Sequence, residues 1–332
     1  MKSRRAAHAE KDRLAAALAG VAPPDTSIVV FGSLARDEFT SGSDVDWTLL
    51  LDGQADSGHL DVVLQIDREL EALGTRAPNP GGTFGRFAVS HDLIHRIGGD
   101  DDTNHNTTQR ILLLLESAAL GENDEAYARV ISGVLRRYVE EDAGAGAPDT
   151  EFRVPRFLLN DITRYWRTLT VDFAHKRRLR RGKGWALRTA KLRMSRKLIY
   201  AAGLLSCFSC ETDLSPEPVK SLQHRVSLTV RHLSMLVRRS PLDITAGALL
   251  PHEGLHPAAR ELFGAYDAFL AALDDEVARN TLDTLAPEDA ESNATYREIR
   301  DIGVRFQDAL TTIFFDSHGT PLSDLTRRYG VF

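Results

Sequence analysis

The sequence is poor in cysteine and has no long hydrophobic run. Its 332 residues include two cysteines, Cys207 and Cys210, spaced C-x-x-C. A structural zinc site usually needs four cysteine or histidine ligands, and no second pair with suitable spacing is present, so a zinc site is not expected. The purely apolar runs, such as 111–115, are far too short to span a bilayer. The N-terminus also lacks the apolar core of a signal peptide, and we therefore expect a cytoplasmic protein.

A strong net charge is also missing. The formal net charge is −6, which argues against a general nucleic-acid binder. The charge is unevenly spread, however, because residues 164–197 contain thirteen lysines and arginines and one acid, Asp172. This stretch, with the basic segment 176–184 inside it, predicts a surface that faces phosphates, either those of a nucleotide or those of an RNA or DNA acceptor.

Hydrophobic periodicity divides the chain into two parts. The first 100 residues follow the order strand, turn, strand, helix, strand, and a small-residue linker lies at 144–148. We expect an α/β domain at 1–145, with a small mixed sheet and helices on one side, followed by an all-α domain at 150–332 that closes the nucleotide cleft. The predicted strands are 28–31, 44–51 and 84–93, and the main predicted helices are 6–20, 60–73, 126–139, 157–173, 185–205, 216–237, 257–277 and 295–314.

One short motif carries chemistry. A strand ends in Gly32-Ser33, and ten residues later Asp44 and Asp46 flank Val45. A glycine at such a turn lets a phosphate approach the main chain, and the serine hydroxyl can add a hydrogen bond. Side chains alternate along a strand, so two aspartates at i and i+2 share one face. Two converging carboxylates are best explained by a hard divalent cation, with Mg²⁺ the usual choice beside phosphates.

This pattern resembles the signature of the DNA polymerase β-like nucleotidyltransferase superfamily, and the specific match covers residues 28–51. The resemblance implies a nucleoside triphosphate, ATP or UTP, and two Mg²⁺ ions held by Asp44 and Asp46. The flanking segment adds Arg36 and Ser43 to Gly32 and Ser33 as predicted nucleotide contacts. Segments 107–117 and 164–173 are more loosely similar to the uridylyltransferase of nitrogen regulation.

Two further roles follow from the resemblance. Such enzymes usually carry a third acid on a later strand, and Asp92, at the end of the predicted strand 84–93, is the candidate, with 100–102 in reserve. A lysine from the helical domain could neutralise the β- and γ-phosphates, and Lys191 is the candidate. Glu116, after the apolar run 112–115, is interpreted as part of the core, a buried or capping acid.

The predicted reaction moves a nucleoside monophosphate from the triphosphate to an acceptor hydroxyl and releases pyrophosphate. The looser resemblance favours a protein as acceptor, whereas the basic stretch favours RNA; a small molecule or a second nucleotide stays open. A rival of another class is a catalytically silent nucleotide-binding module, and a second is a helical interaction protein. The discriminator for the silent module is a third carboxylate within metal reach of Asp44 and Asp46.

Overall fold

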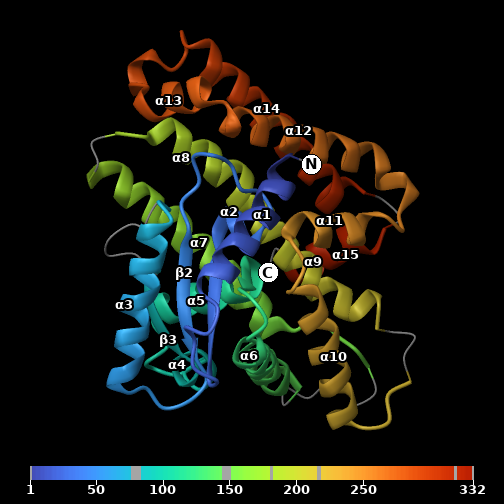
Figure 1. Cartoon of the computed structure of the whole chain (residues 1–332). Coiled ribbons are helices and arrows are strands. Elements are labelled where there is room, and N and C mark those ends of the chain that lie inside the picture. Colours follow the sequence, from blue (N-terminus) through green and yellow to red (C-terminus); the bar gives the residue numbers. More distant parts are fainter. Residues whose placement is uncertain are drawn as a thin grey trace.

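The fold combines a small sheet, formed by the N-terminal part of the chain, with helices that make up most of the remainder (Figure 1). This order confirms the predicted fold class. The computed structural model describes residues 2–75, 84–143, 151–179, 182–214, 218–317 and 320–330. Within these ranges, none of the helices combines the length and the apolarity that a bilayer crossing requires.

The sheet has four strands in the order β3-β2-β1-β4. The central strands β1 (Thr26–Phe31) and β2 (Asp46–Leu51) are antiparallel, and Phe31 lies opposite Asp46. β3 (Arg86–Val89) runs parallel to β2, and β4 (Ser117–Ala119), a strand not predicted from the sequence, runs antiparallel to β1. The sheet is therefore mixed, and the register brings the start of β2 next to the end of β1.

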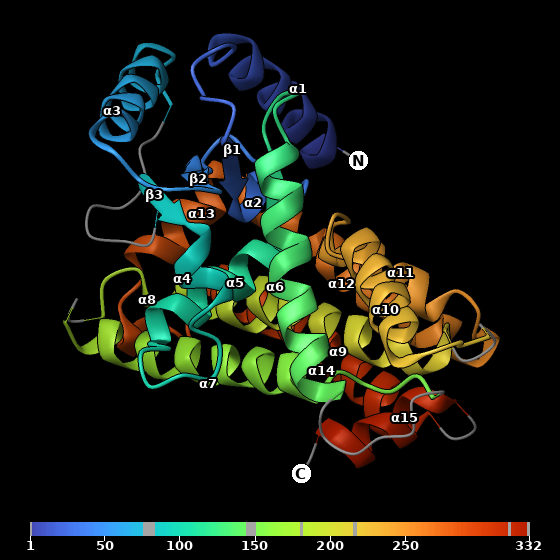
Figure 2. The same ribbon diagram turned by 90° about the horizontal axis from the view of Figure 1, so that it is seen from below.

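Alternation along the strands gives each face of the sheet its own hydrophobic core. Val30 and Leu49 point to a core with α1 (Lys2–Ala17) and α3 (Ser57–Ala72). Val29 and Leu50 point to the larger core with the helices of the other face, which are α4 (Ser90–Ile94), α5 (Asn104–Leu115) and α6 (Glu125–Ala143). Figure 2 shows the sheet between these two groups of helices. Helices therefore cover both faces of the sheet, whereas we had predicted helices on one face.

The remaining helices extend the larger core to the C-terminal region. That core joins sheet residues such as Phe31 to residues as late as Leu325, so no separate core marks the predicted boundary. The predicted linker at 144–148 lies outside the described residues. The helices are α7 (Arg156–Leu179), α8 (Trp185–Lys191), α9 (Lys197–Thr212), α10 (Leu222–Leu236), α11 (Pro241–Leu249), α12 (His256–Asp274), α13 (Glu276–Thr284), α14 (Ala294–Thr311) and α15 (Pro321–Leu325), with short η2 (Glu253–Leu255) and η3 (Pro287–Asp289).

A π-helical turn, η1 (Leu192–Arg196), joins α8 to α9, and two others, η4 (Thr312–Asp316) and η5 (Thr326–Gly330), lie near the C-terminus. In a π-turn the backbone bonds close over five residues, so side chains five apart lie on nearly the same side of the helix. Lys191 and Arg196 have this spacing. The turn therefore lets one continuous helical segment direct both cations towards the end of β1.

Candidate active site

The Gly32-Ser33 turn lies directly beside Asp46. Gly32 opens the short helix α2 (Gly32–Ala35) and has a φ of +67°, a backbone conformation that favours glycine. A Cβ at this position would also lie 3.1 Å from Oδ2 of Asp46. Glycine is thus favoured at this position for two reasons. The structure also has the predicted proximity of the turn to Asp46.

Asp44 and Asp46 are both partly buried, and their charges interact. Asp46 begins β2 on the same face of the sheet as Thr48 and Leu50, the face towards α5. The predicted strand 44–51 therefore starts two residues too early, and Asp44 lies in the loop before β2. Desolvation raises the pKa of Asp46 to about 6, and the neighbouring carboxylates of Glu116 and Asp44 contribute to the rise, which Arg196 and Arg36 oppose. Burial and neighbouring carboxylates therefore both disfavour the ionised form of Asp46.

Glu116, and not Asp92, is the third acid near this pair. It follows α5 and precedes β4, whose first residue, Ser117, pairs with Phe31. The β4 register therefore carries Glu116 to the end of β1. The sequence holds one signal that could have revealed it, namely an acid between an apolar helix and a run of small residues that pairs with β1.

Asp92 lies elsewhere. The predicted strand 84–93 ends at Val89, and Asp92 is on the helix α4 that follows. Since β3 is parallel to β2 and Val89 lies opposite Leu51, α4 starts at the far end of β2 from Asp46. The carboxylate of Asp92 is half-exposed and pairs with Arg96 at 2.9 Å. Of the reserve candidates, Asp102 is buried in an ion pair with Arg110 at 2.8 Å. The geometry thus removes these acids from the site.

Arg36 and Ser43 have internal partners in the structure. Arg36 is 6% exposed, and its guanidinium pairs with Glu38 at 2.9 Å and with Glu116. The Ser43 hydroxyl accepts a hydrogen bond from the Thr40 amide at 3.1 Å, which shapes the loop before Asp44. We therefore assign both residues to the framework of the site. Ser33 is half-buried in the turn, next to Gly32.

Glu116 is held by two arginines from distant parts of the chain. Arg36 reaches it from the segment after α2, and Arg196 reaches it from η1. Glu38 and Tyr266, on α12, complete the group. The hydroxyl of Tyr266 donates a hydrogen bond to Oε1 of Glu38 at 2.8 Å. We call these five residues the arginine–carboxylate cluster. Because three helical regions contribute to it, the cluster connects the sheet to the helices around it.

Lys191 comes to the site as predicted. Its amine is at the end of α8, reachable by solvent yet closely surrounded by protein. The pKa of Lys191 falls to about 8, mainly because of desolvation and in addition because of the positive charges of Arg279 and Arg196, while Asp44 opposes the fall. Arg279, on α13, had no role in the sequence analysis. The helical region thus directs positive charge towards Asp44.

A divalent cation fits this arrangement in part. Asp44 and Asp46 supply the one or two carboxylates with which Mg²⁺ usually binds beside phosphate oxygens. Glu116, which a second ion would need, is already paired with two arginines. Among the residues described, no group of three or more histidine, cysteine, aspartate and glutamate side chains is placed to hold a metal ion. The donor set fits one Mg²⁺, and the predicted second ion lacks a third protein carboxylate in this arrangement.

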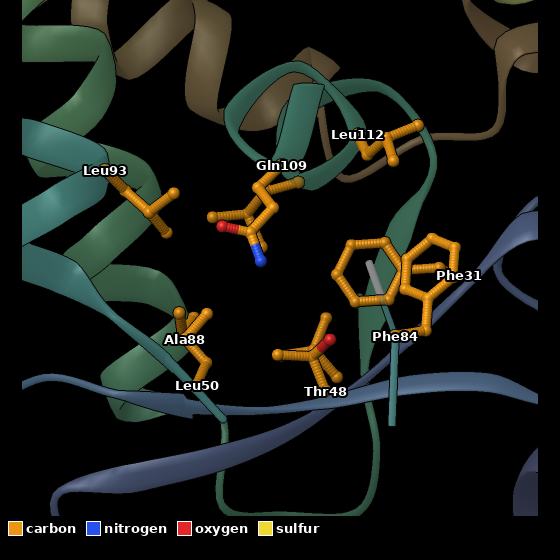
Figure 3. A pocket seen from close by; sticks show the side chains of 10 residues that line it. Phe31, Thr48, Leu50, Phe84, Ala88, Leu93, Gln109 and Leu112 are labelled. Atoms are coloured by element: carbon orange, nitrogen blue, oxygen red, sulfur yellow. The ribbon is translucent and has the colours of Figure 1, made fainter. Parts of the chain in front are cut away.

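A narrow cavity lies on the face of the sheet to which Thr48 and Leu50 point. It lies under β1 and β2 and is lined by Thr48, Gln109 and the rings of Phe31 and Phe84, among others (Figure 3). The two rings lie 4.9 Å apart between their centroids. The lining has no charged side chain, so this cavity does not suit a phosphate.

Comparison with known proteins supports the resemblance drawn from the motif. Residues 13–77 match the sequence model of the family described as the nucleotidyltransferase domain. A search of curated proteins found no match. The matched range contains the Gly32-Ser33 turn, Asp44, Asp46 and the loop that leads to them, but neither Glu116 nor Lys191. The chain carries a nucleotidyltransferase domain at residues 13–77, consistent with membership of the DNA polymerase β-like nucleotidyltransferase superfamily.

Proposed function

We propose that the protein transfers a nucleoside monophosphate from a nucleoside triphosphate to an acceptor hydroxyl and releases pyrophosphate. The observation that carries the proposal is the meeting of the Gly32-Ser33 turn, the acids Asp44 and Asp46, and the cation of Lys191 at one place. Acids and cations at one site are what a metal-bound triphosphate needs, because the metal requires carboxylates and the phosphates require donors.

The reaction is an in-line displacement at the α-phosphorus. The oxygen of the acceptor hydroxyl forms a bond to that phosphorus, the bond to the β-phosphate oxygen breaks, the hydroxyl proton passes to solvent, and pyrophosphate leaves. Gly32 and Ser33 orient the triphosphate through the turn, and Lys191 offsets charge on its terminal phosphates. Mg²⁺ held by Asp44 and Asp46 would stabilise charge on the phosphate oxygens. The acceptor that the looser resemblance favours is a protein side chain, with RNA, a small molecule or a nucleotide as alternatives.

The test is label transfer from each α-labelled nucleoside triphosphate in the presence of Mg²⁺, with and without cell extract. We expect label on one acceptor class with the wild-type protein and none with the double variant Asp44→Ala/Asp46→Ala. Omission of Mg²⁺ should have the same effect as the double variant. Equal labelling by wild type and double variant would exclude the proposed metal role.

The structure also gives one reason to keep the silent nucleotide-binding module as a second candidate. The third acid, Glu116, is paired with two arginines instead of standing open beside Asp44 and Asp46. A silent module would bind the triphosphate with Mg²⁺ but would release no pyrophosphate with any acceptor. Measuring nucleotide affinity and pyrophosphate release on the same preparation separates the two functions.

A further inference from the structure

Arg279 lies against the loop that leads into Asp44. Its guanidinium donates a hydrogen bond to the carbonyl oxygen of Gly42, 237 positions away in sequence. The loop and α13 meet beside α8 (Figure 1). A Cβ at Gly42 would lie 1.7 Å from Nη1 of Arg279 and 2.3 Å from its Cζ. The guanidinium thus occupies the space that any side chain at position 42 would need.

The helix that carries Arg279 is fastened to the helix that carries Lys191. The amide of Gly184, just before α8, donates to the carbonyl oxygen of Asp283 at 3.1 Å. The indole Nε1 of Trp185 donates to the carbonyl oxygen of Leu285 at 2.8 Å. These bonds tie the C-terminal end of α13 to the N-terminal end of α8, so the two cations are presented from adjoining helices.

The charges around Lys191 are only partly balanced. Arg36 and Arg196 are paired with carboxylates of the arginine–carboxylate cluster. Within the described part of the chain, the ion pairs account for neither Lys191 nor Arg279. The two cations interact, as the lowered pKa of Lys191 indicates, and like charges held close together are stabilised by an anion between them. Asp44 reduces this excess, but a divalent cation bound at Asp44 and Asp46 would restore it.

We propose that Arg279 binds the terminal phosphates of a polyphosphate beside Lys191 and thereby selects triphosphates over monophosphates. The identity of the polyphosphate as a nucleotide rests on the proposed function, whereas the anion site itself does not. A guanidinium has five N–H donors, so Arg279 can keep its hydrogen bond to Gly42 and still donate to phosphate oxygens. The contact with Gly42 holds the side chain at the mouth of the site and reduces the entropy lost on binding.

Calorimetric titration with inorganic tripolyphosphate and with orthophosphate, with and without Mg²⁺, tests the assignment. We expect Arg279→Ala to weaken tripolyphosphate binding by about tenfold or more, because one charge-assisted contact is lost, and to leave orthophosphate binding nearly unchanged. Arg279→Lys should recover part of the affinity. Arg297→Ala, at an exposed position on α14, removes the same charge and should match the wild type.

Gly42→Ala provides an independent variant that keeps the arginine. Its methyl group displaces the guanidinium, so tripolyphosphate affinity should fall, while Gly42 itself offers phosphate no side chain. A purely structural role for Arg279 would instead lower the affinities for ATP and AMP by the same factor, and the ratio of the two affinities would not change.

The outcomes separate this inference from the proposed transferase. If tripolyphosphate binds Arg279→Ala as tightly as it binds Arg297→Ala, the assignment of Arg279 is wrong, and persistent label transfer by the wild type would leave the transferase standing. If the wild type transfers no label but loses tripolyphosphate affinity on Arg279→Ala, the polyphosphate site is supported and the transferase is not. Should Arg279→Ala fail to fold, Arg279→Lys and Gly42→Ala decide the question by the same ratio.

Discussion

Two groups of charges meet at Asp46, and they are balanced in opposite ways. In the arginine–carboxylate cluster, arginines alternate with glutamates, and every charge has an opposite neighbour. At the open site, acid lies by acid and cation by cation. Desolvation is the main cause of the rise in the pKa of Asp46 to about 6 and of the fall in the pKa of Lys191 to about 8, and nearby like charges add to each shift. The first group is satisfied by the protein itself, whereas the second is the site at which we propose that a metal and phosphates bind.

The balanced arrangement occurs again away from the site. Arg110, fully buried on α5, pairs with Asp102 at 2.8 Å and with Asp161 at 2.7 Å, and its Nε donates to the hydroxyl of Tyr138 at 2.6 Å. One such group therefore lies near the start of α5 and the other, through Glu116, at its end. Paired arginines of this kind fix a helix in place, so pairing by itself does not mark a binding site.

The largest effect is expected from a substitution that removes an ion pair from the arginine–carboxylate cluster. Glu116→Gln leaves Arg36 and Arg196 without their shared carboxylate in a buried setting. Removing one partner of a buried ion pair typically costs about 3–5 kcal/mol. We expect a loss of this order in the free energy of unfolding, measured by urea denaturation followed by circular dichroism.

The matched control for Glu116→Gln is Glu140→Gln. This change breaks the exposed pair between Glu140 and Arg136 on α6, so stability should change little. If the two variants lose the same free energy of unfolding, the arginine–carboxylate cluster does not stabilise the fold as we infer.

A smaller effect of opposite sign is expected at the open site. Asp46 has a pKa of about 6 in the folded protein and an ordinary value of 3.8. The folded state therefore binds the proton more tightly, and ionisation of Asp46 costs stability as the pH rises from about 4 to 6. Asp46→Asn mimics the protonated form, so without metal it should stabilise the protein by about 1–3 kcal/mol above pH 6 and by little below pH 4.

Thermal unfolding in EDTA, at pH values from about 3.5 to about 8, measures the stability difference between wild type and Asp46→Asn. This range covers the titration of Asp46 in both the unfolded and the folded state. Addition of Mg²⁺ should raise the melting temperature of the wild type and leave that of Asp46→Asn unchanged, because only the wild type keeps both metal-binding carboxylates. A stability difference that is the same at every pH would contradict the raised pKa of Asp46 in the folded protein.

The smallest effect is expected at Asp92, the residue that was predicted as the third acid and that lies away from the site. Asp92→Ala removes a half-exposed pair with Arg96 and no contact with the site. Its stability should stay within about 0.5 kcal/mol of the wild type, and its label transfer should be unchanged. A loss of transfer on the scale of Asp44→Ala would return Asp92 to the site and contradict the placement of α4.

The predicted and missed parts of the site differ in the range of the interactions that form them. Gly32, Asp44 and Asp46 were predictable because a turn and the strand paired with it lie within one short stretch of sequence. Asp92 was misplaced because a short strand and the helix after it share one run of mixed residues, and periodicity does not locate the border. Glu116 was interpreted as core because nothing nearby in sequence shows that β4 pairs with β1.

The sequence by itself determined the local features of this protein: a β-branched strand, a glycine where φ must be positive, two acids close to this turn in sequence, and amphipathic helices after them. Only the tertiary structure decided which distant charges meet these features. Strand pairing carried Glu116 to Gly32, a π-turn aligned Lys191 with Arg196, and packing of α13 on α8 brought Arg279 to Gly42. The reason is physical: backbone preferences act over a few residues, whereas electrostatic partners are chosen by packing across the whole core.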